Sequence, residues 1–279
     1  RLLQQGRVSQ LRHDDLLIRC SPKMATQSND VHYRDRTTSD MLYLTGWVDP
    51  EATLVMRCVE GTWLAHLFVQ PKDTLKEIWE GRRPGTEGAE AQWPIDEAFS
   101  CEERNSHLAG WMNDARRVYH RGGVDSEVDQ LVSDAIRKRD RARQHFGTGP
   151  VTIEDPSSIL AELRLRKSAS EIEQMLYSGK VASLAHELAM RHSRKGVTEY
   201  QLQSVIEGFF SYAGGSGWSY PSIVGCGENA TILHYTVNSD ECDWDDVSLN
   251  DAGDESGSDT HLTLPPQRSV ASVIVASRV

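Results

Sequence analysis

The sequence predicts an α/β domain over residues 1–150 followed by an α+β domain over residues 151–279. Three observations lead to this division. Short apolar runs between polar turns dominate residues 14–70, which is typical of strands. Segments with helical periodicity follow them, so the first half alternates strands with helices. After "GTGPVTIEDPSSI", where Gly, Pro and Ser cluster, two long amphipathic segments precede short strand-like runs.

Four strands are predicted in the first half, at "DLLIRC", "MLYLTGW", "ATLVMRCV" and "WLAHLFV". Helices are predicted over residues 98–116 and 125–145. In the second of these, Val128, Leu131, Val132, Ala135 and Ile136 form one apolar stripe.

Two helices and three strands are predicted in the second half. The first helix starts at a cap, Ser168 or Ser170, and ends at Gly196. The second is capped by Thr198 and stops at Gly214. The strands are expected around "SIVGCG", "ILHYT" and "VSLNDAG".

Composition excludes several classes of function. The formal net charge of -11 argues against a nucleic-acid partner, which needs a basic face. No apolar run reaches the roughly 18 to 20 residues that cross a bilayer, and no signal peptide is visible, so no membrane partner is expected. The five cysteines are scattered and form no C-x-x-C pair. We therefore expect reduced thiols in a cytoplasmic protein.

Asp251 and Asp259 are the first candidates for a chemical role. Both fall in strand-like segments, separated by the Gly- and Ser-rich "AGDESGS". If antiparallel strands flank a tight turn there, the two aspartates face one another with Cα atoms roughly 5 Å apart. Two carboxylates that close need a proton or a cation between them, and Mn²⁺ or Mg²⁺ suits hard oxygen ligands. A solvated acidic turn is the alternative interpretation.

His234 and Tyr220 are the next candidates. His234 follows two aliphatic residues in "ILHYT", so we expect it at the end of a buried strand. Its imidazole there is either a hydrogen-bonded structural group or a donor to a developing oxyanion. Tyr220 opens "YPSIVGCGEN", a tight strand–loop turn in which Gly225 and Gly227 permit close backbone approach.

Taken together, these segments resemble the Xaa-Pro aminopeptidases (aminopeptidase P). They belong to the "pita-bread" metallopeptidase family M24, which also holds prolidase, methionine aminopeptidase and creatinase. The stretches "YRDRTTSDMLYLTGWVDPEATLVM" and "EIWEGRRPG" resemble the family's non-catalytic N-terminal domain. "AELRLRKSASEIEQM", "EYQLQSVIEGFF", "YPSIVGCGENATILHYTVN" and "NDAG" resemble the opening of its catalytic domain.

The resemblance implies a site with two divalent ions, usually Mn²⁺, whose bridging water attacks the peptide bond before proline. It implies that Asp251 and Asp259 are metal ligands and that His234 is the substrate-side catalytic histidine. We also expect Tyr220 to bind substrate. The family pattern has about three more residues between the two aspartates. It also adds one histidine and two glutamate ligands, which "PPQRSVASVIVASRV" does not resemble. We therefore expect a C-terminally truncated, inactive form with an incomplete catalytic domain.

The expected parent function is removal of the N-terminal residue from peptides with proline at the second position. The resemblance also implies a homo-dimer or homo-tetramer formed through the N-terminal domain. Two alternatives stay open: a non-catalytic homologue that binds peptides or oligomerises, and a prolidase-like dipeptidase. "EIWEGRR" and "YLTGW" favour aminopeptidase P over the latter.

Overall fold

A computed structural model describes residues 11–33, 36–141, 148–255 and 270–278. The chain divides into two compact units, Arg1–Arg166 and Lys167–Val279. This division lies later in the chain than the 150/151 boundary expected from composition, because helix α6 (Ser157–Leu165) packs into the core of the first unit through Ile159.

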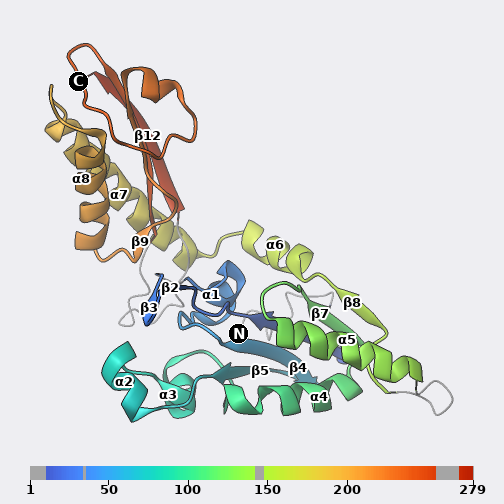
Figure 1. The fold of residues 1–279 in the computed structure, drawn as a ribbon. Helices are drawn as coiled ribbons and strands as arrows, with labels where there is room; N and C mark the ends of the chain where they lie inside the picture. The colour runs from blue at the N-terminus through green and yellow to red at the C-terminus, as the bar shows by residue number, and fades with distance from the viewer. Residues whose placement is uncertain (1–10, 34–35, 142–147, 256–269, 279) are drawn as a thin grey trace. The chain divides into compact units, whose positions relative to one another are not determined.

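The first unit contains a six-stranded mixed sheet in the order β6-β5-β4-β1-β7-β8 (Figure 1). Strand β1 is antiparallel to β4 and parallel to β7. Every residue of β1 is buried, as expected for a central strand covered on both faces. The strands are β1 (Asp15–Cys20), β4 (Thr53–Val59), β5 (Thr62–Val69), β6 (Glu97–Ser100), β7 (Arg117–His120) and β8 (Thr152–Glu154), with a separate β2 (Thr26–Ser28) and β3 (Val31–His32) pair.

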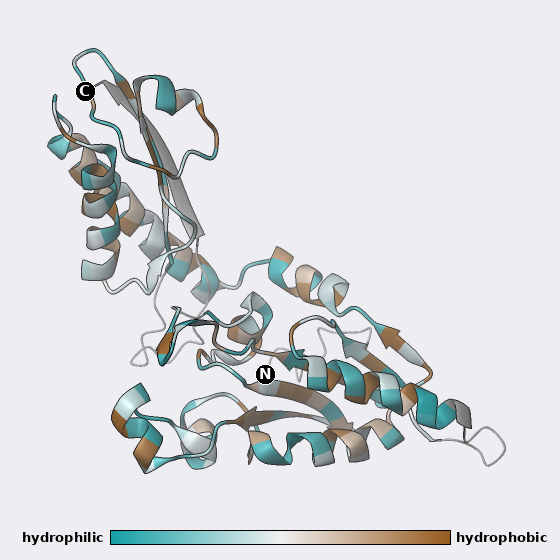
Figure 2. Ribbon diagram, viewed as in Figure 1, coloured by the Kyte–Doolittle hydropathy of each residue, from teal (hydrophilic) through white to brown (hydrophobic). Residues whose placement is uncertain are grey.

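Helices cover both faces of this sheet. Neighbouring residues on β1 point to opposite faces: Leu17 packs with Met41 of α1, whereas Leu16 packs with Leu108 of α4 and Val128 of α5. Figure 2 shows β4 and β5 coloured mainly as hydrophobic and α5 alternating in colour, as an amphipathic surface helix should. The predicted α/β class is confirmed. The helices are α1 (Ser39–Thr45), α2 (Thr74–Glu80), α3 (Gly85–Gln92), η1 (Cys101–Glu103), α4 (Arg104–Asp114) and α5 (Ser126–Arg141).

Two predictions for the first unit are wrong in detail. "MLYLTGW" belongs to helix α1 and not to a strand: the Thr38 side chain caps the Met41 N–H, and Gly46 ends the helix at φ 75°. Residues 98–100, expected at the start of a helix, complete strand β6, which pairs with β5. A side-chain cap decides the first case, and pairing with a strand about 30 residues earlier in the chain decides the second.

The second unit packs two helices on one face of a small sheet. Helix α7 (Ala169–His192) begins with a reciprocal capping box between Ser168 and Glu171, which confirms Ser168 as its cap. Helix α8 (Glu199–Tyr212) follows Thr198 as predicted, and Figure 1 shows it beside α7. The sheet has the order β10-β11-β12, with β9 paired to the end of β11. Its elements are β9 (Gly217–Trp218), β10 (Ile223–Cys226), η3 (Gly227–Thr231), β11 (Val247–Glu255) and β12 (Val270–Arg278).

Candidate metallopeptidase site

Asp251 lies on the sheet face of the second unit that is turned away from α7 and α8. Its neighbour Ala252 is buried in the core that those helices form, whereas Asp251 is half-buried. Successive side chains on a strand point to opposite faces, so the Asp251 carboxylate faces the other side. Strand β11 runs between β10 and β12, which fixes the position of Asp251 from both sides.

Tyr220 contacts this carboxylate directly. It lies in the segment between β9 and β10, and its hydroxyl donates a hydrogen bond to Asp251 Oδ1. The structure therefore brings together two of the residues predicted from the sequence, one expected to bind substrate and one expected to bind metal.

The prediction that Asp251 and Asp259 face one another on adjacent antiparallel strands is wrong. Strand β11 continues to Glu255, past the position expected to begin a tight turn. Both ladder neighbours of Asp251 are occupied, by Ile223 on β10 and Ile274 on β12. Asp259 itself lies outside the described residues, so its role as a metal ligand stays a prediction.

The described residues do not complete a metal site. Over the ranges given above, no group of three or more His, Cys, Asp or Glu side chains converges so as to hold a cation. A single carboxylate does not hold a divalent ion against water, because such sites need several oxygen or nitrogen ligands. The donors described here thus do not fit a two-metal centre by themselves, and we derive no reaction step through a metal.

His234 is exposed and does not lie at the end of a buried strand as predicted. The 3₁₀ helix η3 ends at Thr231 and His234 follows in a turn, flanked by Leu233, which is 87% exposed. No hydrogen bond within the described part joins His234 to Asp251. The aliphatic residues before His234 suggested burial, but here they lie on the surface of a loop.

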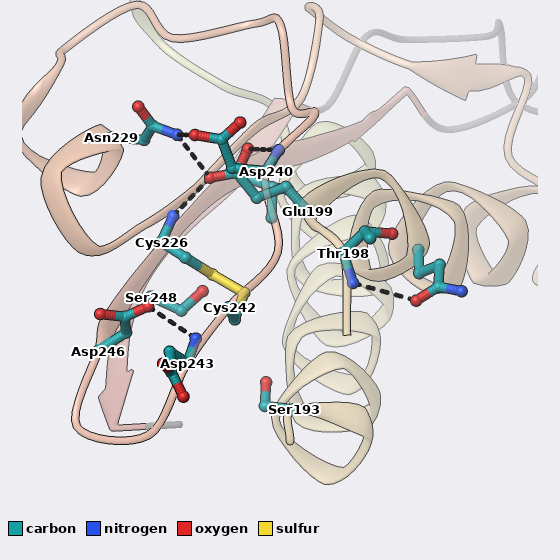
Figure 3. The surroundings of a disulfide bond; sticks show 12 residues. Ser193, Thr198, Glu199, Cys226, Asn229, Asp240, Cys242, Asp243, Asp246 and Ser248 are labelled. Atoms are coloured by element: carbon teal, nitrogen blue, oxygen red, sulfur yellow. Dashed lines mark hydrogen bonds between the residues drawn. A yellow bond between two sulfur atoms is a disulfide. The ribbon is translucent and has the colours of Figure 1, made fainter. Parts of the chain in front are cut away.

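A disulfide joins the two ends of this loop. Cys226, the last residue of β10, is bonded to Cys242, and both side chains are buried (Figure 3). The prediction that all five cysteines are reduced is therefore wrong for this pair, while Cys20, Cys58 and Cys101 are free. Disulfides are rare in reducing compartments, so the thiol-based reason for a cytoplasmic location does not extend to these two cysteines. The sequence pattern did not indicate this disulfide because its two cysteines are 16 residues apart.

Asn238 anchors the same loop to strand β10. Its Oδ1 accepts from the Val224 N–H at 3.1 Å, and its Nδ2 donates to the Ser222 carbonyl at 2.8 Å and to Gln203 Oε1 at 2.9 Å. Asn238 adopts a left-handed φ of 48°, a conformation that Asn tolerates better than most residues. Sequence reasoning missed this residue, although an Asn in a polar turn is the available signal.

The opposite face of β11 carries a buried acid. Asp254 is 1% exposed, and burial raises its pKa to about 6. The Ser178 hydroxyl of α7 donates to Asp254 Oδ2 at 3.3 Å, while Oδ1 has no partner within the described residues. Asp254 and Asp251 thus lie on opposite faces of one strand, and Asp254 belongs to the interior beneath the helices.

The predicted glycine turn at the start of the loop is confirmed. A Cβ atom on Gly225 would lie 2.8 Å from the backbone of Asn229, and Gly227 has a left-handed φ of 56°. These glycines let η3 fold back directly against β10.

No helix within the described ranges is both long and apolar enough to cross a membrane.

Comparison with known proteins places both units in one family. Residues 4–119 match the family described as Aminopeptidase P, N-terminal domain, and residues 173–264 match Metallopeptidase family M24. Xaa-Pro aminopeptidase of Escherichia coli is 37% identical over 240 residues, which cover 86% of this chain and 54% of that protein. The Haemophilus influenzae Xaa-Pro aminopeptidase is 32% identical, covering 97% of this chain and 63% of the relative.

Solved structures agree in fold. Proline aminopeptidase P II from Yersinia pestis has a TM-score of 0.83 at 36% identity, over 91% of this chain and 58% of that one. Zn-substituted E. coli aminopeptidase P in complex with product has a TM-score of 0.87 at 32% identity, over 99% and 60%. The chain thus spans between about half and two thirds of the length of these relatives. It belongs to the aminopeptidase P branch of metallopeptidase family M24.

Proposed function

We propose that this chain forms part of a metal-dependent Xaa-Pro aminopeptidase, which removes the N-terminal residue from peptides with proline at the second position. The observation that carries the proposal is the placement of Asp251. Its carboxylate lies on the face of the sheet turned away from α7 and α8, on the strand between β10 and β12, and accepts a hydrogen bond from Tyr220; this strand falls within the residues that match family M24.

The proposed roles follow from chemistry and exposure. Asp251 and Asp259 supply carboxylate oxygens to divalent metal, for which Mn²⁺ is the proposed ion. His234, exposed on its loop, is available to donate to a substrate carbonyl. Tyr220 holds one oxygen of Asp251 through its hydroxyl and so limits the orientations of the carboxylate toward substrate and metal.

A chimera tests this proposal. Residues 1–264 are joined to the part of E. coli Xaa-Pro aminopeptidase that follows the aligned region, and release of the first residue from an X-Pro peptide is measured with Mn²⁺. We expect cleavage by the chimera, none by the 279-residue chain, and at least a hundredfold loss in Asp251→Asn and Asp259→Asn. An X-Ala peptide is the matched substrate control. A folded chimera without activity would contradict the proposal, and equal cleavage of both peptides would contradict proline specificity.

A non-catalytic peptide-binding protein is the second candidate, favoured by the lack of a converged ligand cluster among the described residues. Its test is calorimetric titration of the 279-residue chain with an X-Pro peptide in the presence of a chelator. Binding that survives chelation and is lost in His234→Ala supports this candidate, and no binding eliminates it.

Three finer statements belong to the same proposal. A homo-dimer or homo-tetramer through the first unit is tested by light scattering of residues 1–166. A cytoplasmic location is tested by cell fractionation. The absence of a nucleic-acid partner, expected from the net charge of -11, is tested by a filter-binding assay at low salt.

A further inference from the structure

The loop from Gly227 to Glu241, which carries His234, has little apolar anchoring of its own. Three of its apolar residues are exposed: Ile232 by 50%, Leu233 by 87% and Val237 by 72%. Hydrophobic burial therefore does not fix the middle of the loop, and polar contacts have to do so.

Those contacts converge on Glu199, which is 0% exposed. Glu199 Oε1 accepts the Cys226 N–H at 2.8 Å and Asn229 Nδ2 at 3.0 Å. Glu199 Oε2 accepts the Tyr235 hydroxyl at 2.8 Å and the Asp240 N–H at 3.0 Å. Figure 3 shows Cys226, Asn229 and Asp240 directed at this one carboxylate.

The burial of this charge is compensated without a cation. No salt bridge to Glu199 is found within the described residues; four hydrogen-bond donors face its two oxygens. Glu199 is also the first residue of α8, where the helix N-terminus favours a negative charge. The Glu199 N–H donates in turn to the Asp240 carbonyl at 2.9 Å, which closes the contact from both directions.

The four donors flank His234 on both sides. Asn229 precedes it, whereas Tyr235 is its immediate neighbour and Asp240 follows. Asn229 Nδ2 also donates to Asp240 Oδ2 at 2.8 Å, so one amide bridges two carboxylates. The disulfide joins the two ends of the loop and Asn238 binds the part after His234 to β10. Glu199, in contrast, binds residues both before and after His234.

We propose that Glu199 is the positioning residue for the His234 loop: its buried carboxylate holds the arms before and after His234 in one conformation. The Tyr235 pKa supports this, since burial and the hydrogen bond to Glu199 raise it above its usual value. The inference rests on the proposed function where it makes His234 the group that needs positioning.

The experiment uses hydrogen exchange on the 279-residue chain. Glu199→Gln keeps the size of the side chain, but its NH2 group would face two of the groups that now donate to the carboxylate. Exchange of amides in residues 227–241 should therefore become roughly tenfold faster or more. Exchange in α7 should stay unchanged, and the NMR-measured pKa of Tyr235 should fall toward its usual value. Glu187→Gln, a glutamate on the surface of α7 that accepts from Arg191, is the control and should change neither the loop exchange nor the Tyr235 pKa.

Unchanged loop exchange in Glu199→Gln would overturn the proposal, as would equal acceleration of loop and α7. If that variant does not fold, Tyr235→Phe removes one donor from the loop side and should accelerate the same amides by a smaller factor.

Positioning is separated from function in the chimera. Adding Glu199→Gln to His234→Ala should cause no further loss of kcat, because the group being positioned is gone. Additive losses would overturn the positioning role. If His234→Ala alone leaves kcat unchanged while Glu199→Gln loosens the loop, the proposed role of His234 fails and the loop anchor stands.

Discussion

Reduction of the Cys226–Cys242 disulfide should destabilise the second unit, by an amount that follows from the length of the loop it closes. The bond closes a loop with a sequence separation of 16 residues. Restricting the unfolded chain by a loop of that length stabilises the folded state by about 3 kcal/mol at 25 °C in the chain-entropy treatment. Reduction by a dithiol yields two cysteine thiols and an oxidised dithiol, and should remove this stabilisation from the second unit.

The assay is urea unfolding followed by pulsed hydrogen exchange and peptide mass analysis, with and without reductant. Peptides from residues 167–255 report the second unit, and those from residues 36–141 report the first. The first unit is the internal control, because its described cysteines are free thiols in both states. The Cys226→Ala/Cys242→Ala double variant should behave like the reduced protein.

We expect a loss near 3 kcal/mol that is confined to the second unit. Two results would refute the reasoning: a change below about 1 kcal/mol, or five reactive thiols in the denatured, unreduced protein. The first would mean that native contacts or residual structure in the unfolded chain already restrict the loop. The second would mean that the bond is absent.

The remaining predictions concern packing and pH. Gly225→Ala places a Cβ atom 2.8 Å from the Asn229 backbone and should destabilise the second unit by about 1–3 kcal/mol, measured by urea unfolding. Its control, Gly208→Ala, meets nothing within 4 Å on α8 and should stabilise by up to about 1 kcal/mol. Burial raises the Asp254 pKa from 3.8 to about 6, so the folded state keeps a proton that the unfolded chain has released between these values. The free energy of unfolding should therefore fall as pH rises through this window. Asp254→Asn should abolish this fall and raise the free energy of unfolding by about 3 kcal/mol at pH 7. A variant whose stability depends on pH as the parent's does would contradict the burial argument.

The sequence predicted regular elements where local signals and tertiary packing agree. Residue type and spacing limited the α7 cap to Ser168 or Ser170, of which the structure has Ser168, and identified the glycine turn beginning at Gly225. "MLYLTGW" was misassigned because an apolar run of that length fits a short buried helix as well as a strand, and the cap at Thr38 decides between them.

The site was predicted less completely than the fold. Asp251 and Tyr220 were candidates from residue pattern, and the contact between them required the structure. Glu199 was hidden because a glutamate in the first turn of a helix ordinarily serves the helix dipole, with no sequence signal for its complete burial. The Cys226–Cys242 disulfide and the anchoring role of Asn238 depend on contacts between residues distant in sequence. Residue pattern alone does not specify such contacts.

The most direct test of the proposed site is a crystal structure of the chimera soaked with Mn²⁺, with anomalous scattering recorded at the manganese edge. A manganese peak bonded to carboxylate oxygens of both Asp251 and Asp259 is the predicted result. A peak elsewhere, with Asp251 bound to Tyr220 and no manganese beside either aspartate, would contradict the claim that these two residues serve a common cation.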